Sequence, residues 1–329
     1  MSIKDIQEYL KPGLDQVNVF IDSALRSDIP LLDSTNRSVR EHPGKMMRPM
    51  LALLVAEAAG PATPPPEDTY RYAATAELLH NATLLHDDVV DGAVERRGVP
   101  TAAKLLGGGP AVLIGDYWLV NCMTEVLGAA HEPERVLRVF AQTLHHLTEG
   151  ELLQMEKAGK GDTTEADYLR IVYGKTASLF EATATAAAIS ARASEEQVKA
   201  VGQFARLLGT AFQIKDDILD YCEASAALGK PVGLDLKEQK ITLPLLCALE
   251  AVPADEAARL RTCVTQVTEH PEHIDTLVDF VHAQDGVVKA ARKMDDYISQ
   301  AIACLDVLPE TAARQYLTTL AQFVGDRKA

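Results

Sequence analysis

The chain contains few aromatic residues and few cysteines, and it has no long uninterrupted apolar run. Phe, Trp and Tyr make up 5% of its 329 residues, which is a poor composition for a protein built from β-sheet. Its five cysteines are odd in number and lie far apart, so a disulfide scaffold and a zinc ribbon are excluded and a reducing, cytoplasmic compartment is expected. No apolar run reaches about 18 residues, so we expect no transmembrane segment. The first residues, Met1 to Ile6, do not have the pattern of a secretory signal.

Basic side chains are also scarce relative to acidic ones. The chain has 32 Lys and Arg against 47 Asp and Glu, a formal net charge of −15. A protein with this balance lacks the positive face with which nucleic-acid binders displace counterions, so we expect no nucleic-acid partner. Hydrophobic residues make up 47% of the chain, which is enough for a large buried core.

Apolar residues recur with helical spacing along most of the chain. The segments Pro49 to Ala59 and Val136 to Leu147 each show one apolar helix face. The segment Tyr72 to Val90 is apolar nearly all round, which is typical of a helix at the centre of a bundle. We therefore predict an all-α protein with a single domain over residues 1–329. Four short clusters of Gly and Pro are interpreted as loops within it: 61–66, 107–110, 159–161 and 229–233.

One motif, Asp-Asp-x-x-Asp, occurs twice, each time after an apolar helical run. The first and last acids of each motif are four residues apart, so they share a helix face and repel each other. Gly92 follows the first motif directly, which places those acids near a helix C-terminus, the negative end of the dipole. A solvated acidic helix end explains either motif alone, but the pair together indicates a cation site. The candidate metal ligands are Asp87, Asp88, Asp91, Asp216, Asp217 and Asp220.

Ligands that are all oxygen suit Mg²⁺ or Ca²⁺ rather than zinc or copper. Magnesium completes its coordination with water and substrate phosphates, so the two motifs predict a phosphorylated substrate held through bridging Mg²⁺ between two helices. Basic residues near both motifs would bind phosphate oxygens, although solvated surface charge is the simpler interpretation of any one of them. These residues are Lys45, Arg48, Arg96, Arg97, Lys230 and Lys240.

Taken together, these segments resemble the trans-isoprenyl diphosphate synthases, in particular the bacterial polyprenyl type that includes octaprenyl diphosphate synthases. The resemblance covers about residues 43 to 246 in the order found in the family. It rests on five blocks: 44–49, 78–98, 174–177, 212–220 and 230–244. The chain departs from the family at Pro43, where a second glycine is usual, and at Met46 and Met47, which separate Lys45 from Arg48.

The resemblance implies an isoprenoid-synthase-like bundle of antiparallel helices around a deep central cavity, usually as a homodimer. It implies condensation of isopentenyl diphosphate, head to tail, with an allylic diphosphate of the farnesyl or geranylgeranyl type. Asp87, Asp91, Asp216 and Asp220 would hold Mg²⁺ on the allylic diphosphate, supported by Asp88 and Asp217. The same diphosphate would be contacted by Arg96, Lys175, Lys230 and Lys240, with Thr176 and Gln213 near the reacting centre. Isopentenyl diphosphate would be bound by Lys45, Arg48, His80 and Arg97.

The residues that precede the first acid motif by one or more helical turns are expected to determine product length. Ala82 and Thr83 precede Asp87 by one helical turn and carry no aromatic ring, so they leave room for a growing chain. We therefore expect a medium- or long-chain all-trans polyprenyl diphosphate, released with possible peripheral contact to a membrane. A short-chain (C15 or C20) synthase, a terpene cyclase and a non-catalytic subunit of a heteromeric synthase remain alternatives. The residues expected to line the pocket are Thr75, Leu78, Leu79, Ala82 and Thr83.

Overall fold

The computed structural model describes residues 2–42, 44–222 and 232–326, and these residues are almost entirely helical. Within these ranges the only strands are β1 (Glu95–Arg96) and β2 (Val99–Pro100). They pair antiparallel, with Glu95 opposite Pro100. The prediction of an all-α protein is confirmed.

The chain divides into two compact units. The first comprises residues 1–141, 182–202 and 307–317, and the second comprises residues 142–181, 203–306 and 318–329. Four helices contribute residues to both units: α7 (Pro133–Lys160), α9 (Ser178–Ser190), α10 (Glu195–Asp220) and α17 (Ala312–Asp326). The first acid motif belongs to the first unit and the second motif to the second.

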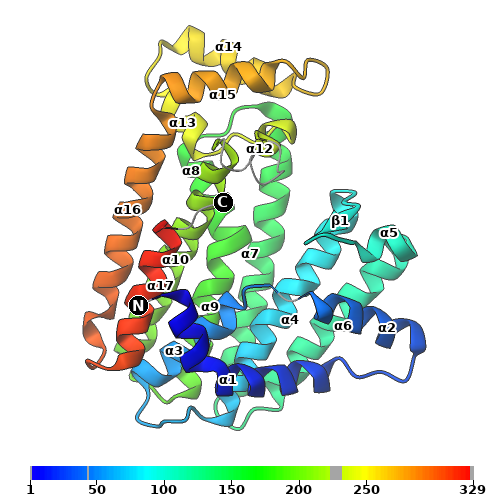
Figure 1. Cartoon of the computed structure of the whole chain (residues 1–329), viewed down its shortest axis with the longest axis vertical. Helices are drawn as coiled ribbons and strands as arrows, with labels where there is room; N and C mark the ends of the chain where they lie inside the picture. The colour runs from blue at the N-terminus through cyan, green and yellow to red at the C-terminus, as the bar shows by residue number, and fades with distance from the viewer. Residues whose placement is uncertain (1, 43, 223–231, 327–329) are drawn as a thin grey trace. The chain divides into compact units, whose positions relative to one another are not determined.

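The first unit is organised around α4. Its elements, besides the hairpin and its share of the four helices above, are α1 (Ile3–Ala24), α2 (Pro30–Glu41), α3 (Met47–Ala59), α4 (Glu67–Val90), α5 (Ala102–Leu106) and α6 (Gly108–Leu127). Helix α4 packs against α1, α3 and α6, and α6 runs beside it in Figure 1. Every residue from Tyr72 to Leu79 is buried, because apolar side chains surround this part of the helix. The predicted central helix is confirmed for the first unit.

Two of the predicted loops are wrong in extent. Helix α6 begins at Gly108, so only Gly107, with φ of 89°, separates it from α5. Pro110 lies in the first turn of α6, where its missing N–H costs no helical hydrogen bond. Helix α7 likewise continues through Gly159 to Lys160, and the turn comes at Gly161, with φ of 66°. Most of the predicted loop at 229–233 lies outside the described residues.

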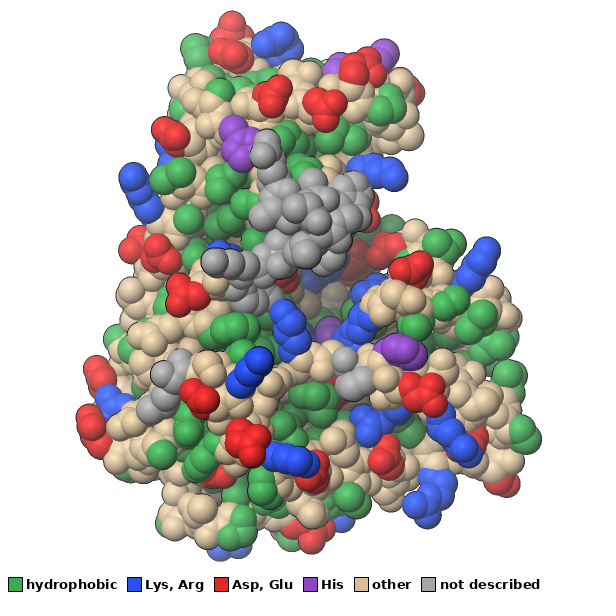
Figure 2. All heavy atoms as spheres, viewed as in Figure 1, with side chains coloured by type: hydrophobic (Ala, Val, Ile, Leu, Met, Phe, Trp, Pro, Cys, Tyr) green, Lys and Arg blue, Asp and Glu red, His purple; other side chains and the backbone are tan. Residues whose placement is uncertain are grey.

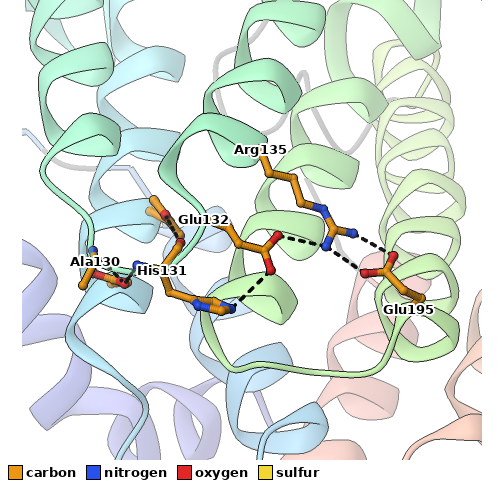
Figure 3. Close-up of polar contacts among 7 residues, drawn as sticks. Ala130, His131, Glu132, Arg135 and Glu195 are labelled. Carbon is orange, nitrogen blue, oxygen red and sulfur yellow. Dashed lines mark hydrogen bonds and ion pairs between the residues drawn. The ribbon is translucent and has the colours of Figure 1, made fainter.

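Figure 3 shows how the connection between α6 and α7 is held in the first unit. The Asp68 carboxylate, only 8% exposed, accepts hydrogen bonds from the backbone N–H groups of Ala130 (3.0 Å) and His131 (2.8 Å). Arg135, in the first turn of α7, donates to both carboxylate oxygens of Glu195 at 2.8 Å. These contacts fix the start of α7 to α4 and α10.

The second unit contains the elements that follow α7. They are α8 (Glu165–Val172), a π-helical turn η1 (Tyr173–Ala177), α12 (Leu234–Lys237), α13 (Leu243–Leu249), α14 (Ala254–Thr265), α15 (His273–Ala283) and α16 (Gly286–Cys304), with the 3-10 turn η2 (Leu305–Val307) at the boundary. Helix α13 is buried along its whole length and packs against α8, α15 and α16. Its residues are part of the core of this unit.

Charged side chains are spread over the molecular surface. Figure 2 shows acidic and basic side chains interspersed on one face. None of the helices in the described ranges is both long enough and apolar enough to cross a membrane.

Candidate functional site

The first acid motif ends helix α4. Asp87 and Asp88 lie in its last turn, and the N–H of Asp91, the C-cap residue, donates to the carbonyl of Asp87 at 2.8 Å. Gly92 follows with φ of 64°, a conformation that favours glycine. The predicted position at a helix C-terminus is therefore confirmed. Asp87 and Asp91 are four residues apart and lie on the same face at the end of helix α4. Asp88 lies about 100° around the helix axis from Asp87.

Asp88 anchors the hairpin that carries two arginines. Its side chain is buried, at 4% exposure, and accepts a hydrogen bond of 2.7 Å from Nε of Arg96 on β1. Arg97 and Gly98 both have positive φ, at 54° and 80°, which gives the tight two-residue turn that suits a hairpin. The middle acid of the first motif is thus engaged by the protein itself.

The Arg97 side chain packs against the loop before α3. Its Nη1 donates to the carbonyl of His42 at 3.0 Å. A Cβ placed on Gly44 would lie 2.7 Å from Nη2 of Arg97, so any larger residue at Gly44 would displace the guanidinium. The neighbouring Lys45 side chain is exposed.

Arg48 and His80 belong to one basic cluster with Arg97, and they are its more deeply buried members. Burial lowers the pKa of Arg48 to about 10, an effect that the Glu77 carboxylate opposes and the Arg97 charge reinforces. Burial also lowers the pKa of His80 well below its usual value, and the positive charges of Arg48 and Arg97 lower it further. His80 is therefore neutral at pH 7, so its ring can form hydrogen bonds but carries no charge.

The second acid motif ends helix α10, with its middle acid again buried. Asp217 is 4% exposed, and its two carboxylate oxygens accept hydrogen bonds from the Tyr168 hydroxyl (2.6 Å) and from Nε2 of Gln213 (2.9 Å). Oε1 of Gln213 in turn accepts a hydrogen bond of 2.8 Å from the Thr176 hydroxyl. Thr176 lies in the π-helical turn, so these bonds connect α8, η1 and α10.

Asp220, the last acid of the motif, holds the start of α12. It accepts hydrogen bonds of 3.0 Å from the backbone N–H groups of Leu234 and Asp235. Burial raises the pKa of Asp220, although these backbone bonds oppose the shift. Burial, together with the negative charge of Asp220, raises the pKa of Asp235 to about 7. Burial and the charge of Asp235 likewise raise the pKa of Asp217 well above its usual value.

Carboxylates gathered in this way destabilise one another until a cation neutralises them. The donors are all oxygens, which is the donor set that Mg²⁺ prefers. Within residues 2–42, 44–222 and 232–326, no group of three or more His, Cys, Asp or Glu side chains is placed so that it could by itself hold a metal ion. An all-oxygen donor set that supplies part of a coordination shell is compatible in its chemistry with a Mg²⁺ ion that completes the shell with water and phosphate oxygens.

A pocket of ≈ 190 Å³ in the second unit brings the acids and lysines together. Nζ of Lys175 lies 2.5 Å from the Glu151 carboxylate, and Lys240 pairs with Glu238. The side chains that line the pocket with these two lysines include Gln154, Lys157, Tyr168, Gln213, Asp217 and Asp235. Positive and negative groups in one small pocket suit a metal-bound anion.

The position of Lys175 depends on a close contact between two backbones. A Cβ on Gly150 of α7 would lie 3.0 Å from Cα of Gly174, and one on Gly174 would lie 2.7 Å from the carbonyl of His146. The helix and the π-helical turn therefore touch where both residues lack a side chain. This contact sets Lys175 beside Glu151.

The structure places the remaining sequence-predicted residues as follows. Thr75, Leu78, Leu79 and Ala82 of α4 are fully buried, and Thr83 is half-buried. Asp88, Arg96 and Arg97 line a separate pocket of ≈ 230 Å³ in the first unit, between α2, α4, α5 and the hairpin. Lys230 lies outside the described residues.

Sequence reasoning missed two residues that line the second pocket, Tyr168 and Asp235, and also Glu151, which pairs with Lys175. Each is separated from the second acid motif by a helix end or a loop, so no spacing rule relates it to the motif. Only Asp235 gave a signal, because it is an acid directly after Gly233 and Leu234 in a segment already singled out for its lysines.

Comparisons with known proteins point to one family. The chain is 37% identical to the octaprenyl diphosphate synthase of Haemophilus influenzae, over 99% of this chain and 98% of that protein. Its structure is similar to that of a decaprenyl diphosphate synthase from Rhodobacter capsulatus, with a TM-score of 0.88 and 33% identity over 98% of both chains. It is also similar to a polyprenyl synthase from Caulobacter crescentus complexed with calcium and isoprenyl diphosphate, with a TM-score of 0.87 and 30% identity over 100% of this chain and 98% of that one. The family model for polyprenyl synthetase matches residues 29–281, and the chain belongs to this family.

Proposed function

We propose that the protein is a prenyltransferase that condenses isopentenyl diphosphate with an allylic diphosphate to form a medium- or long-chain all-trans polyprenyl diphosphate. The observation that carries the proposal is the pocket of the second unit, where Lys175, Lys240 and Asp217 line one cavity. The octaprenyl and decaprenyl synthases among its relatives support the length of the product.

We assign the acids of both motifs to the diphosphate of the allylic substrate. Asp87, Asp91, Asp216 and Asp220 would hold Mg²⁺, and Asp88 and Asp217 would support them. Bound there, Mg²⁺ supplies positive charge that stabilises the departing diphosphate. The isoprenyl diphosphate complex of the Caulobacter relative, which contains calcium, supports an oxygen-ligated divalent ion.

The cations divide between the two substrates. Arg96, Lys175 and Lys240, with Lys230, would bind the leaving diphosphate and stabilise charge as its C–O bond breaks. Lys45, Arg48 and Arg97 would bind isopentenyl diphosphate, with the neutral ring of His80 donating a hydrogen bond. The resulting allylic cation requires an apolar, dry surface beside it.

We further propose that the two units act as one catalytic domain and that the chain forms a homodimer. Helices α7, α9, α10 and α17 contribute residues to both units, which supports a single domain.

Leu113, Val120 and Leu127 of α6 are spaced by seven residues and are 69%, 61% and 57% exposed. Such an apolar stripe is typical of a helix that pairs with another. All five cysteines are free thiols, in agreement with a cytoplasmic location.

The test is a condensation assay with labelled isopentenyl diphosphate, farnesyl diphosphate and Mg²⁺, followed by sizing of the product. Asp87→Ala and Asp216→Ala should each lower kcat by at least about a hundredfold, since each removes a metal ligand, while circular dichroism stays unchanged. Asp279→Ala, an exposed acid on α15, is the matched control. Near-normal turnover in either motif variant, or a wild-type protein without Mg²⁺-dependent activity, would contradict the proposal.

A further inference from the structure

A continuous chain of hydrogen bonds crosses the second unit from a buried tyrosine to the π-helical turn. The Tyr168 hydroxyl, Asp217, Gln213 and Thr176 are joined in that order by bonds of 2.6, 2.9 and 2.8 Å. Tyr168 is 4% exposed, so it is largely removed from bulk solvent. Gln213 and Asp217 both line the pocket that contains Lys175 and Lys240.

The direction of these bonds fixes the amide of Gln213. Its Nε2 donates to Oδ1 of Asp217, so the NH₂ group points toward the acid. Oε1 of Gln213 then faces Thr176, and the Thr176 hydroxyl must donate to it. Both amide and hydroxyl oxygens are thereby held in one orientation, with the negative ends of their dipoles away from Asp217.

We infer that Tyr168 is a positioning residue, which locks Asp217 and through it orients Gln213 and Thr176 for the reaction. This inference rests on the proposed function. With Tyr168 bound to one oxygen and Gln213 to the other, the carboxylate has a donor on each side and does not rotate. Fixed dipoles beside a developing cation stabilise it without reorganisation, and Gln213 lines the same pocket as Lys175.

The first variant is Tyr168→Phe, which deletes the hydroxyl and keeps the ring. We expect kcat for condensation to fall about tenfold, as for loss of a hydrogen bond to a charged group, with KM for both substrates within about twofold of wild type. Hydrolysis of the allylic diphosphate, measured as released pyrophosphate, should fall together with condensation because both require the cation. The control is Tyr297→Phe. Tyr297 is a half-buried tyrosine of the same unit that lies outside this series of hydrogen bonds, so the variant should keep wild-type kcat.

The second test is a double-mutant cycle with Gln213→Glu, which removes the NH₂ donor at nearly constant shape. If the residues act as one unit, Tyr168→Phe should cost less than about twofold in kcat when Gln213→Glu is already present. Additive losses would overturn the inference. So would recovery of Tyr168→Phe at high Mg²⁺, which would assign Tyr168 to metal affinity alone, or a normal kcat in that variant. A wild-type enzyme without condensation activity would instead overturn the proposed function.

Discussion

At the scale of single residues, the environment of a side chain decides what it contributes to the site. His80 is an example, because its ring is surrounded by the charges of Arg48, Arg96 and Arg97. Those charges and burial favour the neutral ring in the folded protein, whereas the unfolded chain exposes an ordinary imidazole with a pKa near 6.5. As a result, the free energy of unfolding depends on pH through the protonation of His80.

Acidification below about pH 6.5 should therefore destabilise the fold through His80. The unfolded chain then takes up a proton that the folded chain does not, which costs up to about 1.4 kcal/mol for each pH unit. The stability is present above pH 6.5 and is lost as the pH falls. Urea unfolding followed by circular dichroism should show a shallower decrease between pH 6.5 and 5.5 for His80→Gln than for wild type. His145→Gln, on the exposed face of α7, should follow wild type, and parallel curves for all three proteins would refute the expectation.

The acids of the two motifs could be predicted from the sequence, but the residues that contact them in the structure could not. Asp87 and Asp216 belong to a motif that repeats, and charge repulsion within each motif already indicates a cation. Tyr168 and Asp235 are brought to Asp217 and Asp220 only by the packing of α8 and α12 against the end of α10. A hydrogen bond across elements leaves no periodic trace in the sequence.

At the scale of elements, helix α4 and its flanking breaks show what periodicity establishes. The helix that is apolar all round was predicted correctly as central to its unit, since burial on every side requires apolar residues on every side. The loops at Gly108 and Gly159 were predicted too long, because glycine and proline are also compatible with the first and last turns of a helix. The π-helical turn was not predicted, because no local residue preference marks it.

The residues of α4 that precede Asp87 on the same helix face should control product length. Thr83 lies one turn before Asp87 on the same face and is half-buried, so Thr83→Phe places a ring in the expected path of the growing chain. We expect products shorter by at least one isoprene unit, analysed by reversed-phase chromatography after dephosphorylation. The matched control is Val19→Phe, at a position of α1 in the same unit that is 59% exposed. An unchanged product distribution in Thr83→Phe would place the path elsewhere.

At the scale of the whole molecule, the apolar stripe on α6 has no covering element in its own unit at Leu113, Val120 and Leu127, which are all more than half exposed. Exposed side chains at heptad spacing match what a second copy of the same helix would present. Sequence reasoning did not single out this stripe, because heptad spacing alone does not separate exposed apolar residues from those that face the core.

A charge in the middle of this stripe should dissociate the proposed homodimer. Val120→Asp would bury an unpaired carboxylate in the interface, which is strongly unfavourable. Light scattering should give twice the 35.6 kDa chain mass for wild type and the single mass for the variant. Val288→Asp, at a 47% exposed position on α16, should remain dimeric. A wild-type monomer at micromolar concentration would rule the assembly out.

The π-helical turn at Tyr173–Ala177 has a consequence for how the family can vary. It inserts one residue into an otherwise continuous run of helix, so it offsets everything after it by about 100° around the axis. Removing a single residue there would restore a regular helix and turn the alanine-rich surface of α9 away from its present neighbours. A substitution in this segment that keeps its length leaves that offset unchanged, whereas shortening the segment by one residue would require rebuilding the packing that follows.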